Sequence, residues 1–200
     1  FEDGSFSKPY PCDVVSRPDP DAVATVLWRK RPDGKVEVIL KEGVRPPVFL
    51  RKDKTLVQPD PRPFLTLVEI AAGVLESGDA GPQGILRRAA AETREEAGFD
   101  LSPERFRELG GPMFASPGTS DEKVYFCEAE LADAKPAGKA LGDGSAMEEG
   151  TRIVTLELGE AVRMCRNGQI PDMKTELALL RLADRVGYIP HKDRYEPARA

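Results

Sequence analysis

The sequence predicts a fold of the α/β (α+β) class, and three observations support this prediction. Short apolar runs typical of strands recur along the chain and are separated by turns rich in Gly and Pro. A helical segment that ends near Gly98 carries small side chains on one side, which can pack against a sheet. A second helical segment, residues 173 to 186, places Leu177, Leu179, Leu180 and Leu182 close together.

The composition is that of one globular domain without a basic surface. A chain of 200 residues with 40% hydrophobic content can bury a sizeable core. The formal net charge of −5 gives no electrostatic footprint for nucleic acid, so a nucleic-acid polymer is not an expected partner. No apolar run reaches membrane-spanning length, and the first residues do not resemble a secretory signal. We therefore expect no membrane partner.

The three cysteines and the two ends of the chain complete the expected organisation. Cys12, Cys127 and Cys165 are widely spaced and match no zinc pattern, so they are expected to be ordinary thiols in a reducing cytoplasm. Residues 1–20 are polar and rich in proline, and form either a loosely held arm or an arm that docks on a partner subunit. Residues 21–190 form the domain, and residues 191–200 a polar tail.

The first predicted elements form a hairpin. Residues 22 to 31 are expected to be a strand, residues 32 to 35 a turn, and residues 36 to 41 the second strand. Trp28 is interpreted as a packing residue in preference to one that stacks on a base.

Residues 65 to 100 organise the rest of the chain. An apolar strand, residues 65 to 70, is followed by a predicted turn at residues 71–73 and a helix that ends near Gly98. On that helix Glu92, Glu95 and Glu96 are spaced so that their carboxylates share one face. Such a cluster is often only a solvated face, but a divalent cation would relieve its repulsion. Oxygen ligands favour Mg²⁺ or Mn²⁺ over zinc.

The remaining elements follow in a regular order. A short capping segment is expected at residues 101–107, with a single helical turn after Ser102. Two strands, about residues 111–115 and 122–129, are joined by a Pro-Gly turn, and residues 132–150 form a long loop that is either functional or without fixed structure. A strand at 152–158 precedes helices at 160–167 and 173–186. His191, the only histidine, is interpreted as a surface residue.

The helix and the turn before it resemble the signature of the Nudix hydrolases, G-x5-E-x7-R-E-U-x-E-E-x-G-U, in which U is aliphatic. Gly73 matches the first glycine, Gly98 the last, and the three glutamates those of the helix. Asp79 stands at the first Glu position and is followed by eleven residues, 80 to 90, where the family has seven. Ala91 replaces the signature arginine, and Thr93 and Phe99 stand at the two aliphatic positions.

Further segments resemble the nucleoside diphosphate sugar pyrophosphatases, including the ADP-ribose pyrophosphatases, within that family. Arg45, before two prolines, matches the arginine of a Q-F-R-P-P stretch, in which Gly43 and Val44 replace the Gln-Phe. Arg45 and the nearby Arg51 are candidate substrate contacts, because a guanidinium group can bind phosphate oxygens bidentately. Residues 116 to 122 are similar to S-P-G-x-S-D-E, which contributes Pro117, Gly118 and Ser120 as candidate substrate contacts. Residues 168 to 175 are similar to G-x-I-x-D-x-K-T. The resemblance covers roughly residues 22 to 185 and implies a mixed β-sheet sandwiched between helices.

The resemblance also implies a chemistry. Glu92 and Glu96 would be the bridging ligands of Mg²⁺ (or Mn²⁺), with Glu95 as a further ligand or a supporting catalytic group and the Ala72 carbonyl as another ligand. The general base would be Glu149, with Glu148 as the alternative, both on the loop before the late strand. Because Ala91 cannot hold the glutamates, Arg87 or Arg88, one helical turn earlier, is the candidate substitute.

Two classes of function follow from these residues. The first is a pyrophosphatase that cleaves a nucleoside diphosphate sugar into a nucleoside monophosphate and a sugar phosphate, with ADP-ribose favoured and UDP-glucose or GDP-mannose as alternatives. The second is a weakened domain of the same family that senses a nucleotide ligand. The resemblance also implies a homodimer whose N-terminal regions, residues 1–20, are exchanged between subunits.

Overall fold

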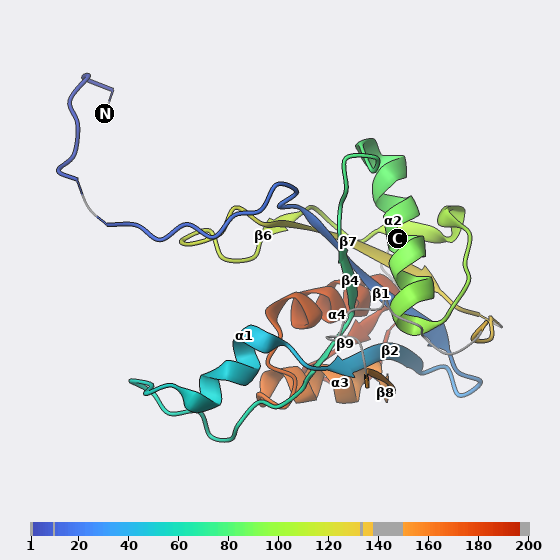
Figure 1. Ribbon diagram of the computed structural model, residues 1–200. Coiled ribbons are helices and arrows are strands. Elements are labelled where there is room, and N and C mark those ends of the chain that lie inside the picture. The colour runs from blue at the N-terminus through green and yellow to red at the C-terminus, as the bar shows by residue number, and fades with distance from the viewer. Residues whose placement is uncertain (1, 10, 133, 138–149, 197–200) are drawn as a thin grey trace.

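A mixed eight-stranded sheet forms the centre of the computed structural model, which describes residues 2–9, 11–132, 134–137 and 150–196 (Figure 1). The strand order is β3-β2-β1-β7-β5, with β4 paired to β1, β6 to β7 and β8 to β2. Only β1 and β7 run parallel, whereas the other neighbours in the sheet are antiparallel. The strands are β1 (Ala22–Lys30), β2 (Val36–Gly43), β3 (Leu67–Glu69), β4 (Ala71–Val74), β5 (Phe106–Glu108), β6 (Met113–Phe114), β7 (Lys123–Glu130) and β8 (Arg152–Glu157).

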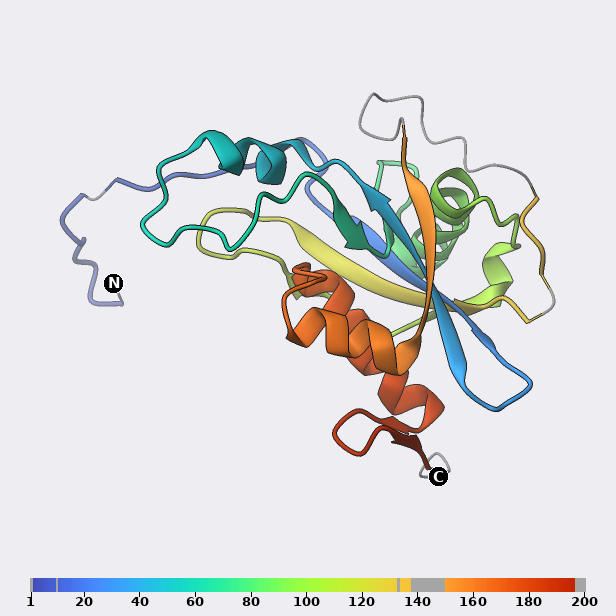
Figure 2. The ribbon, with the colours of Figure 1, turned by 90° about the horizontal axis from the view of Figure 1, so that it is seen from below.

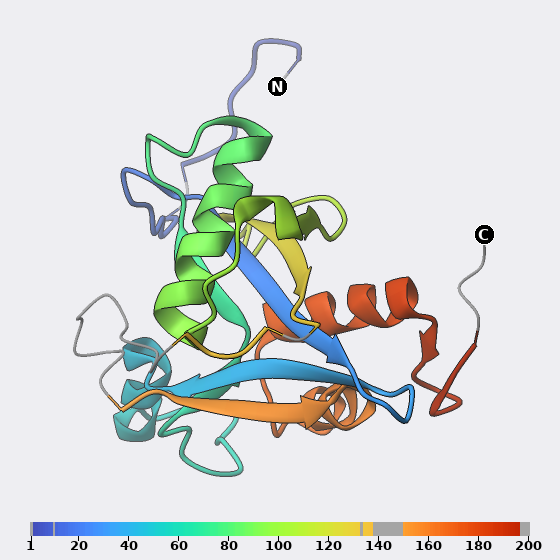
Figure 3. The same ribbon diagram turned by 90° about the vertical axis from the view of Figure 1, so that its right-hand side faces the viewer.

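Helices cover both faces of this sheet, as Figure 3 shows. Helix α2 (Gly81–Ala97) covers one face, and α3 (Leu158–Arg166) and α4 (Met173–Val186) cover the other. Two separate apolar clusters result, one beneath α2 around Val23, Leu27 and Ala89, and one beneath α3 and α4. The predicted α/β class and the predicted sheet between helices are confirmed.

The predicted hairpin and the two predicted helices after residue 150 are also confirmed, with small shifts at their ends. The strands β1 and β2 pair from Leu27 opposite Ile39 to Lys30 opposite Val36. Helix α4 begins after Asp172, whose carboxylate accepts a hydrogen bond from the Thr175 amide as an N-cap. Gly98, at φ 74°, ends α2 in the left-handed conformation that glycine adopts without strain.

The predicted turn at residues 71–73 is wrong, because these residues form the strand β4. The chain leaves β2 after β3 and pairs instead with β1, which places Ala72 opposite Ala24 and Gly73 opposite Val23. The helix begins eight residues after Gly73, where Pro82 occupies the first turn and needs no amide partner. Residues 81 to 90 of the longer segment lie within α2, so the insertion lengthens the helix at its start, and the glutamates keep their place at its end.

Two further elements differ from the expectations. The strand β5 (Phe106–Glu108) was not predicted, and it pairs with β7 directly after the short helix η2 (Pro103–Arg105). Residues 188–195 form a small hairpin of β9 (Tyr188–Ile189) and β10 (Arg194–Tyr195), so the start of the predicted polar tail belongs to the fold. Tyr195 explains this position, because its hydroxyl accepts a hydrogen bond from the Val36 amide and its ring lies against Tyr188.

Two segments extend away from the sheet, as Figure 2 shows. One is the N-terminal arm, which reaches the domain where the Val15 amide donates to the Thr119 carbonyl and Arg17 pairs with Glu122. The other carries α1 (Pro46–Phe49) and the short helix η1 (Leu50–Asp53). Among the described residues no helix is long and apolar enough to cross a membrane.

The cysteines give a prediction about thiol reactivity. Cys12 is exposed, whereas burial raises the pKa of the Cys127 and Cys165 thiols to about 12. Thiolates react and thiols do not, so the buried pair is expected to be inert at pH 8. A chromogenic disulfide reagent should therefore titrate one thiol per folded chain and all three in denaturant. Rapid reaction of two or more thiols in the folded protein would contradict this arrangement.

Candidate functional site

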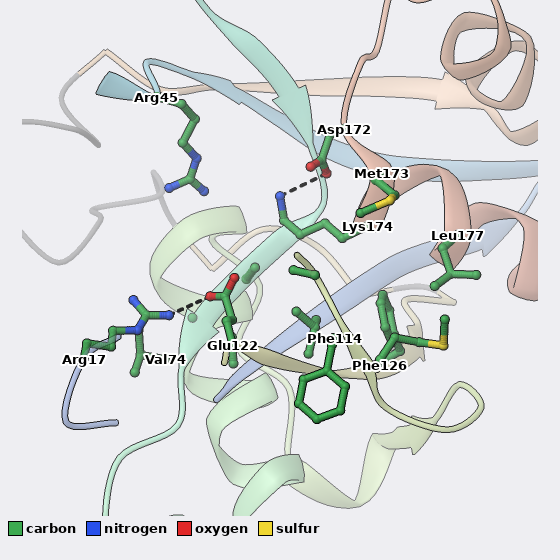
Figure 4. A pocket seen from close by; sticks show the side chains of 16 residues that line it. Arg17, Arg45, Val74, Phe114, Glu122, Phe126, Asp172, Met173, Lys174 and Leu177 are labelled. Atoms are coloured by element: carbon green, nitrogen blue, oxygen red, sulfur yellow. Dashed lines mark hydrogen bonds and ion pairs between the residues drawn. The ribbon is translucent and has the colours of Figure 1, made fainter. Parts of the chain in front are cut away.

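Two adjoining hollows lie where β4 meets α2 and α4. One is apolar, has a volume of about 380 Å³, and is lined by Phe114, Phe126, Met173 and Leu177 among others (Figure 4). The other is charged, has a volume of about 530 Å³, and contains the helix glutamates. Arg17, Arg45 and the β4 residues 72–74 line both, so the two hollows form one continuous site.

The end of α2 supplies the carboxylates of the charged hollow. Glu92, Glu95 and Glu96 all line it, as predicted from their spacing, and Ala72 lines it from β4. Glu96 is buried: one carboxylate oxygen accepts the Ala72 amide at 2.9 Å, and the other contacts Lys41 Nζ. Helix α2 thus presents its acidic face to β4, the segment for which a turn was predicted.

Gly73 allows Glu92 to approach this strand. A Cβ atom at position 73 would lie only 1.8 Å from Glu92 Oε1 and 1.9 Å from its carboxyl carbon. The carboxylate therefore occupies the space that any other residue would fill with its side chain. A side chain at position 73 would displace the Glu92 carboxylate from this place, and this agrees with the match of Gly73 to the first glycine of the motif.

The positive charges near Glu92 are too few to keep its carboxylate ionised at the usual pH. Burial raises its pKa to about 7, and the charges of Glu96 and Glu95 act in the same direction, against Arg88 and Lys41. An oxygen-only set of carboxylates with an excess of negative charge fits a hard divalent cation. Within the described residues no three acidic, histidine or cysteine side chains converge as a ready-made ligand group. The residues fit Mg²⁺ by their chemistry, and the ligand roles of Ala72, Glu92, Glu95 and Glu96 stay predictions.

Arg88, and not Arg87, contacts the helix glutamates. Arg88 lies 3.7 Å from Glu92 Oε1 one turn along the helix, and it also pairs with Asp79 at 2.8 Å and Glu76 at 3.0 Å. Arg87 instead donates to the Gly78 carbonyl at 3.3 Å. Asp79, at the first Glu position of the motif, therefore holds Arg88 near Glu92, and the role of Arg88 as a substitute for the arginine missing at position 91 stays a prediction.

The two neighbouring arginines allow a matched test. In Arg88→Ala the Glu92 carboxylate loses the side chain that orients it, whereas the charge of Arg88 is already balanced by Asp79 and Glu76. We therefore expect Mn²⁺ to bind about tenfold more weakly, as when an outer partner of a metal ligand is removed. Arg87→Ala should bind Mn²⁺ like the parent protein. Calorimetric titration of each variant measures the difference. Equal affinity in both variants would remove Arg88 from this role.

Arg45 stands at the junction of the two hollows, as its predicted phosphate-binding role requires. Its Nε donates to Glu69 Oε1 at 2.5 Å, and Glu69, only 2% exposed, also accepts from Lys174 at 2.6 Å. Lys174 in turn contacts Asp172 at 3.0 Å (Figure 4). A buried carboxylate thus holds two cationic side chains at the wall of the site.

The other predicted substrate contacts are not brought to the hollows. Arg51 is paired with Asp60 at 2.9 Å in a separate depression beside η1. Pro117, Gly118 and Ser120 form the loop between β6 and β7, where Ser120 bridges to Val15 of the arm. None of these four residues lines either hollow among the described residues; Glu122, from the same motif, does. The segment therefore reaches the apolar hollow through Glu122, which is ion-paired with Arg17.

The predicted general bases, Glu148 and Glu149, lie outside the described residues. Thr151, two positions beyond Glu149, lines the charged hollow next to the glutamates. The described chain therefore re-enters the site directly after the predicted base. The role of Glu149 or Glu148 stays a prediction.

Sequence reasoning missed several residues of the site. Lys41 and Glu69 are charged residues at buried positions of β2 and β3, a pattern that signals paired charges within the fold. Phe114 lies in a two-residue strand too short to show alternation. Arg17 comes from the N-terminal arm, and its contact with Glu122 in the same chain could not be inferred from local sequence.

The fold and the site together define the class of protein: an eight-stranded mixed sheet between helices, with a glutamate-bearing helix against a glycine-containing strand, is consistent with the Nudix fold. No protein-family model matches the chain. It is nevertheless a distant homologue of the GDP-mannose pyrophosphatases, Nudix hydrolases of the nucleotide-sugar pyrophosphatase branch.

Three of these relatives illustrate the similarity. The protein of Citrobacter koseri is 31% identical over 113 residues, which make up 56% of this chain and 53% of that protein. Those of Salmonella arizonae and Salmonella paratyphi B are 32% and 34% identical over 115 residues, again 56% of this chain and 53% of the relative. The chain thus spans about half the length of the curated relatives it matches.

Proposed function

We propose that the protein hydrolyses the diphosphate bond of a nucleotide sugar, with Mg²⁺ as cofactor, to give a nucleoside monophosphate and a sugar phosphate. The observation that carries this proposal is the continuity of an apolar hollow and a carboxylate-lined hollow through Arg45. Such a site suits a ligand with a flat apolar end and a charged middle. The names of the relatives support hydrolysis of such a ligand.

The relatives favour GDP-mannose as the first substrate to test. ADP-ribose, which the sequence motifs favour, has less support, because the similar proteins are named GDP-mannose pyrophosphatases. Within the apolar hollow Phe114, 55% exposed, and Met173, 67% exposed, offer apolar surface to a base. The two carboxylates that line this hollow, Glu122 and Asp172, are paired with Arg17 and Lys174, and the hydrolysis assay identifies the base.

The chain's own residues would divide the work between the two hollows. Glu92 and Glu96, with Glu95 and the Ala72 carbonyl, would hold the divalent cation, which when bound offsets the charge of the diphosphate and activates water. Arg45, fixed by Glu69 through its Nε, would orient a diphosphate oxygen through its other guanidinium nitrogens. Glu149, or Glu148, would accept the proton of the attacking water.

The decisive experiment is a hydrolysis assay over GDP-mannose, ADP-ribose and UDP-glucose, with Mg²⁺ and with chelator, followed by chromatography of the products. We expect Mg²⁺-dependent release of a nucleoside monophosphate from at least one of them. Glu96→Gln should lose this activity, whereas Glu160→Gln, an exposed carboxylate on α3, should retain it. No turnover of any nucleotide sugar would refute the proposal.

The sensor alternative draws on one observation, the alanine at position 91 in place of the signature arginine. A sensor would bind one of the same compounds tightly without turnover, which isothermal titration distinguishes from an enzyme.

A homodimer is also proposed, by resemblance alone. Light scattering of the purified protein tests it, and a monomeric mass at micromolar concentration would rule it out.

A further inference from the structure

Lys41 is a buried lysine within the carboxylate cluster. Its side chain is 7% exposed, that of Glu96 is 5% exposed, and Lys41 Nζ contacts Glu96 Oε1 directly. The lysine lies on β2, two residues after Ile39, which packs in the apolar cluster beneath α2. Because alternate residues of a strand share a face, Lys41 also points toward α2, near the end of the helix that carries Glu96.

The other cations that line the charged hollow are bonded elsewhere. Arg45 pairs with Glu69, Arg17 with Glu122, and Arg88 with Asp79 and Glu76, with Glu92 at the longer distance of 3.7 Å. Lys41 also lies close enough to Glu92 for its charge to favour the ionised carboxylate. Among the described residues it is the cation in hydrogen-bonding contact with the predicted metal ligands.

We propose that Lys41 is a tethered counter-cation of Glu96 that sets the affinity of this site for divalent cations. Its ammonium group neutralises Glu96 in the cation-free protein, and the Ala72 amide holds the second oxygen of the same carboxylate. A divalent cation that uses Glu96 must then bind beside a positive charge already in place. Like charges a few ångströms apart repel strongly in the partly desolvated interior of a protein. Lys41 is thus a positioning residue that weakens cation binding and stabilises the empty site.

The test is Mn²⁺ binding, measured by electron paramagnetic resonance, in the full chain without substrate. In Lys41→Met, which keeps the length of the side chain without its charge, we expect Mn²⁺ to bind at least about tenfold tighter. The melting temperature of the cation-free variant should fall, and the rise on adding Mn²⁺ should exceed that of the parent. Lys41→Arg retains the charge and should bind Mn²⁺ like the parent.

A second pair of variants ties the effect to Glu96. In a Glu96→Gln background the cation can no longer use Glu96 and does not bind next to Lys41, so Lys41→Met should change Mn²⁺ affinity far less. If Lys41→Met does not fold, Lys41→Gln keeps a hydrogen-bond donor toward Glu96 without the charge, and the same tightening is expected. Circular dichroism establishes that each variant is folded.

Unchanged or weaker Mn²⁺ binding in a folded Lys41→Met or Lys41→Gln protein would overturn the proposal, as would the absence of Mn²⁺ binding in the parent and both variants. The proposal rests on the cation site of the proposed function, but the measurement needs no substrate. A protein that binds Mn²⁺ as expected and hydrolyses no nucleotide sugar would contradict the proposed function and leave this inference standing.

Discussion

Glu92→Gln should lower kcat/KM for the nucleotide sugar by about a hundredfold, because a neutral amide cannot offer a cation the charge of a carboxylate. The surroundings of Glu92 allow the loss of charge to be separated from a change in the fold. The contact of Glu92 with Arg88 is long, 3.7 Å, and its carboxylate fits into the space above Gly73. Glutamine has the same shape, so the fold should be kept while the charge is lost.

The control for this variant is Glu160→Gln, an exposed carboxylate at the start of α3, remote from the hollows. Glu92→Gln should show the melting temperature of the parent or a higher one, because the charge of Glu92 is poorly compensated. Glu160→Gln should melt close to the parent. Initial rates at saturating and limiting Mg²⁺ measure the effect. If high Mg²⁺ restores the full rate, Glu92 contributes to affinity alone; if activity is unchanged at all Mg²⁺ concentrations, Glu92 is not a ligand.

Glu69→Gln should reduce the free energy of unfolding by about 3 kcal/mol, since it removes the shared partner of two cationic side chains. Glu69 is 2% exposed and pairs with both Arg45 and Lys174, which are themselves partly screened by solvent. For this reason we place the expected loss at the lower end for a broken buried pair. Urea unfolding at pH 7 measures it. Glu37→Gln, which breaks a surface pair with Arg29 on neighbouring strands, should cost less than about 1 kcal/mol.

The ion pairs of Glu69 with Arg45 and Lys174 also predict how the free energy of unfolding changes with pH. Burial alone would raise the pKa of Glu69, but the charges of Lys174 and Arg45 outweigh it and hold that pKa below the ordinary value of 4.5. A carboxyl with a lowered pKa in the folded state contributes stability that is fully present above 4.5 and is lost as the pH falls through the lowered value. The difference between parent and Glu69→Gln should therefore be constant from pH 7 to pH 5 and shrink below that. A difference that grows on acidification would contradict the ionised pair.

Much of the fold could be predicted from local pattern. The hairpin of β1 and β2 follows from two apolar runs around a Pro-Asp-Gly turn, and α4 from its leucine spacing and its Asp172 cap. These elements are set by interactions within a few residues. The strand β4 could not be predicted in this way, because Ala71, Ala72 and Gly73 have weak strand preference and become a strand only by pairing with β1.

For the site, too, the local features could be predicted from the sequence and the long-range contacts could not. Helical spacing alone predicts that Glu92, Glu95 and Glu96 share a helix face and that an arginine one turn earlier could support them. The pairing of strands and the packing of α2 were needed to show that Arg88, and not Arg87, lies near Glu92 and that Lys41 and Glu69 are buried. The physical reason is that these contacts join residues far apart in the chain, and which charges face one another across a sheet depends on strand register and helix position.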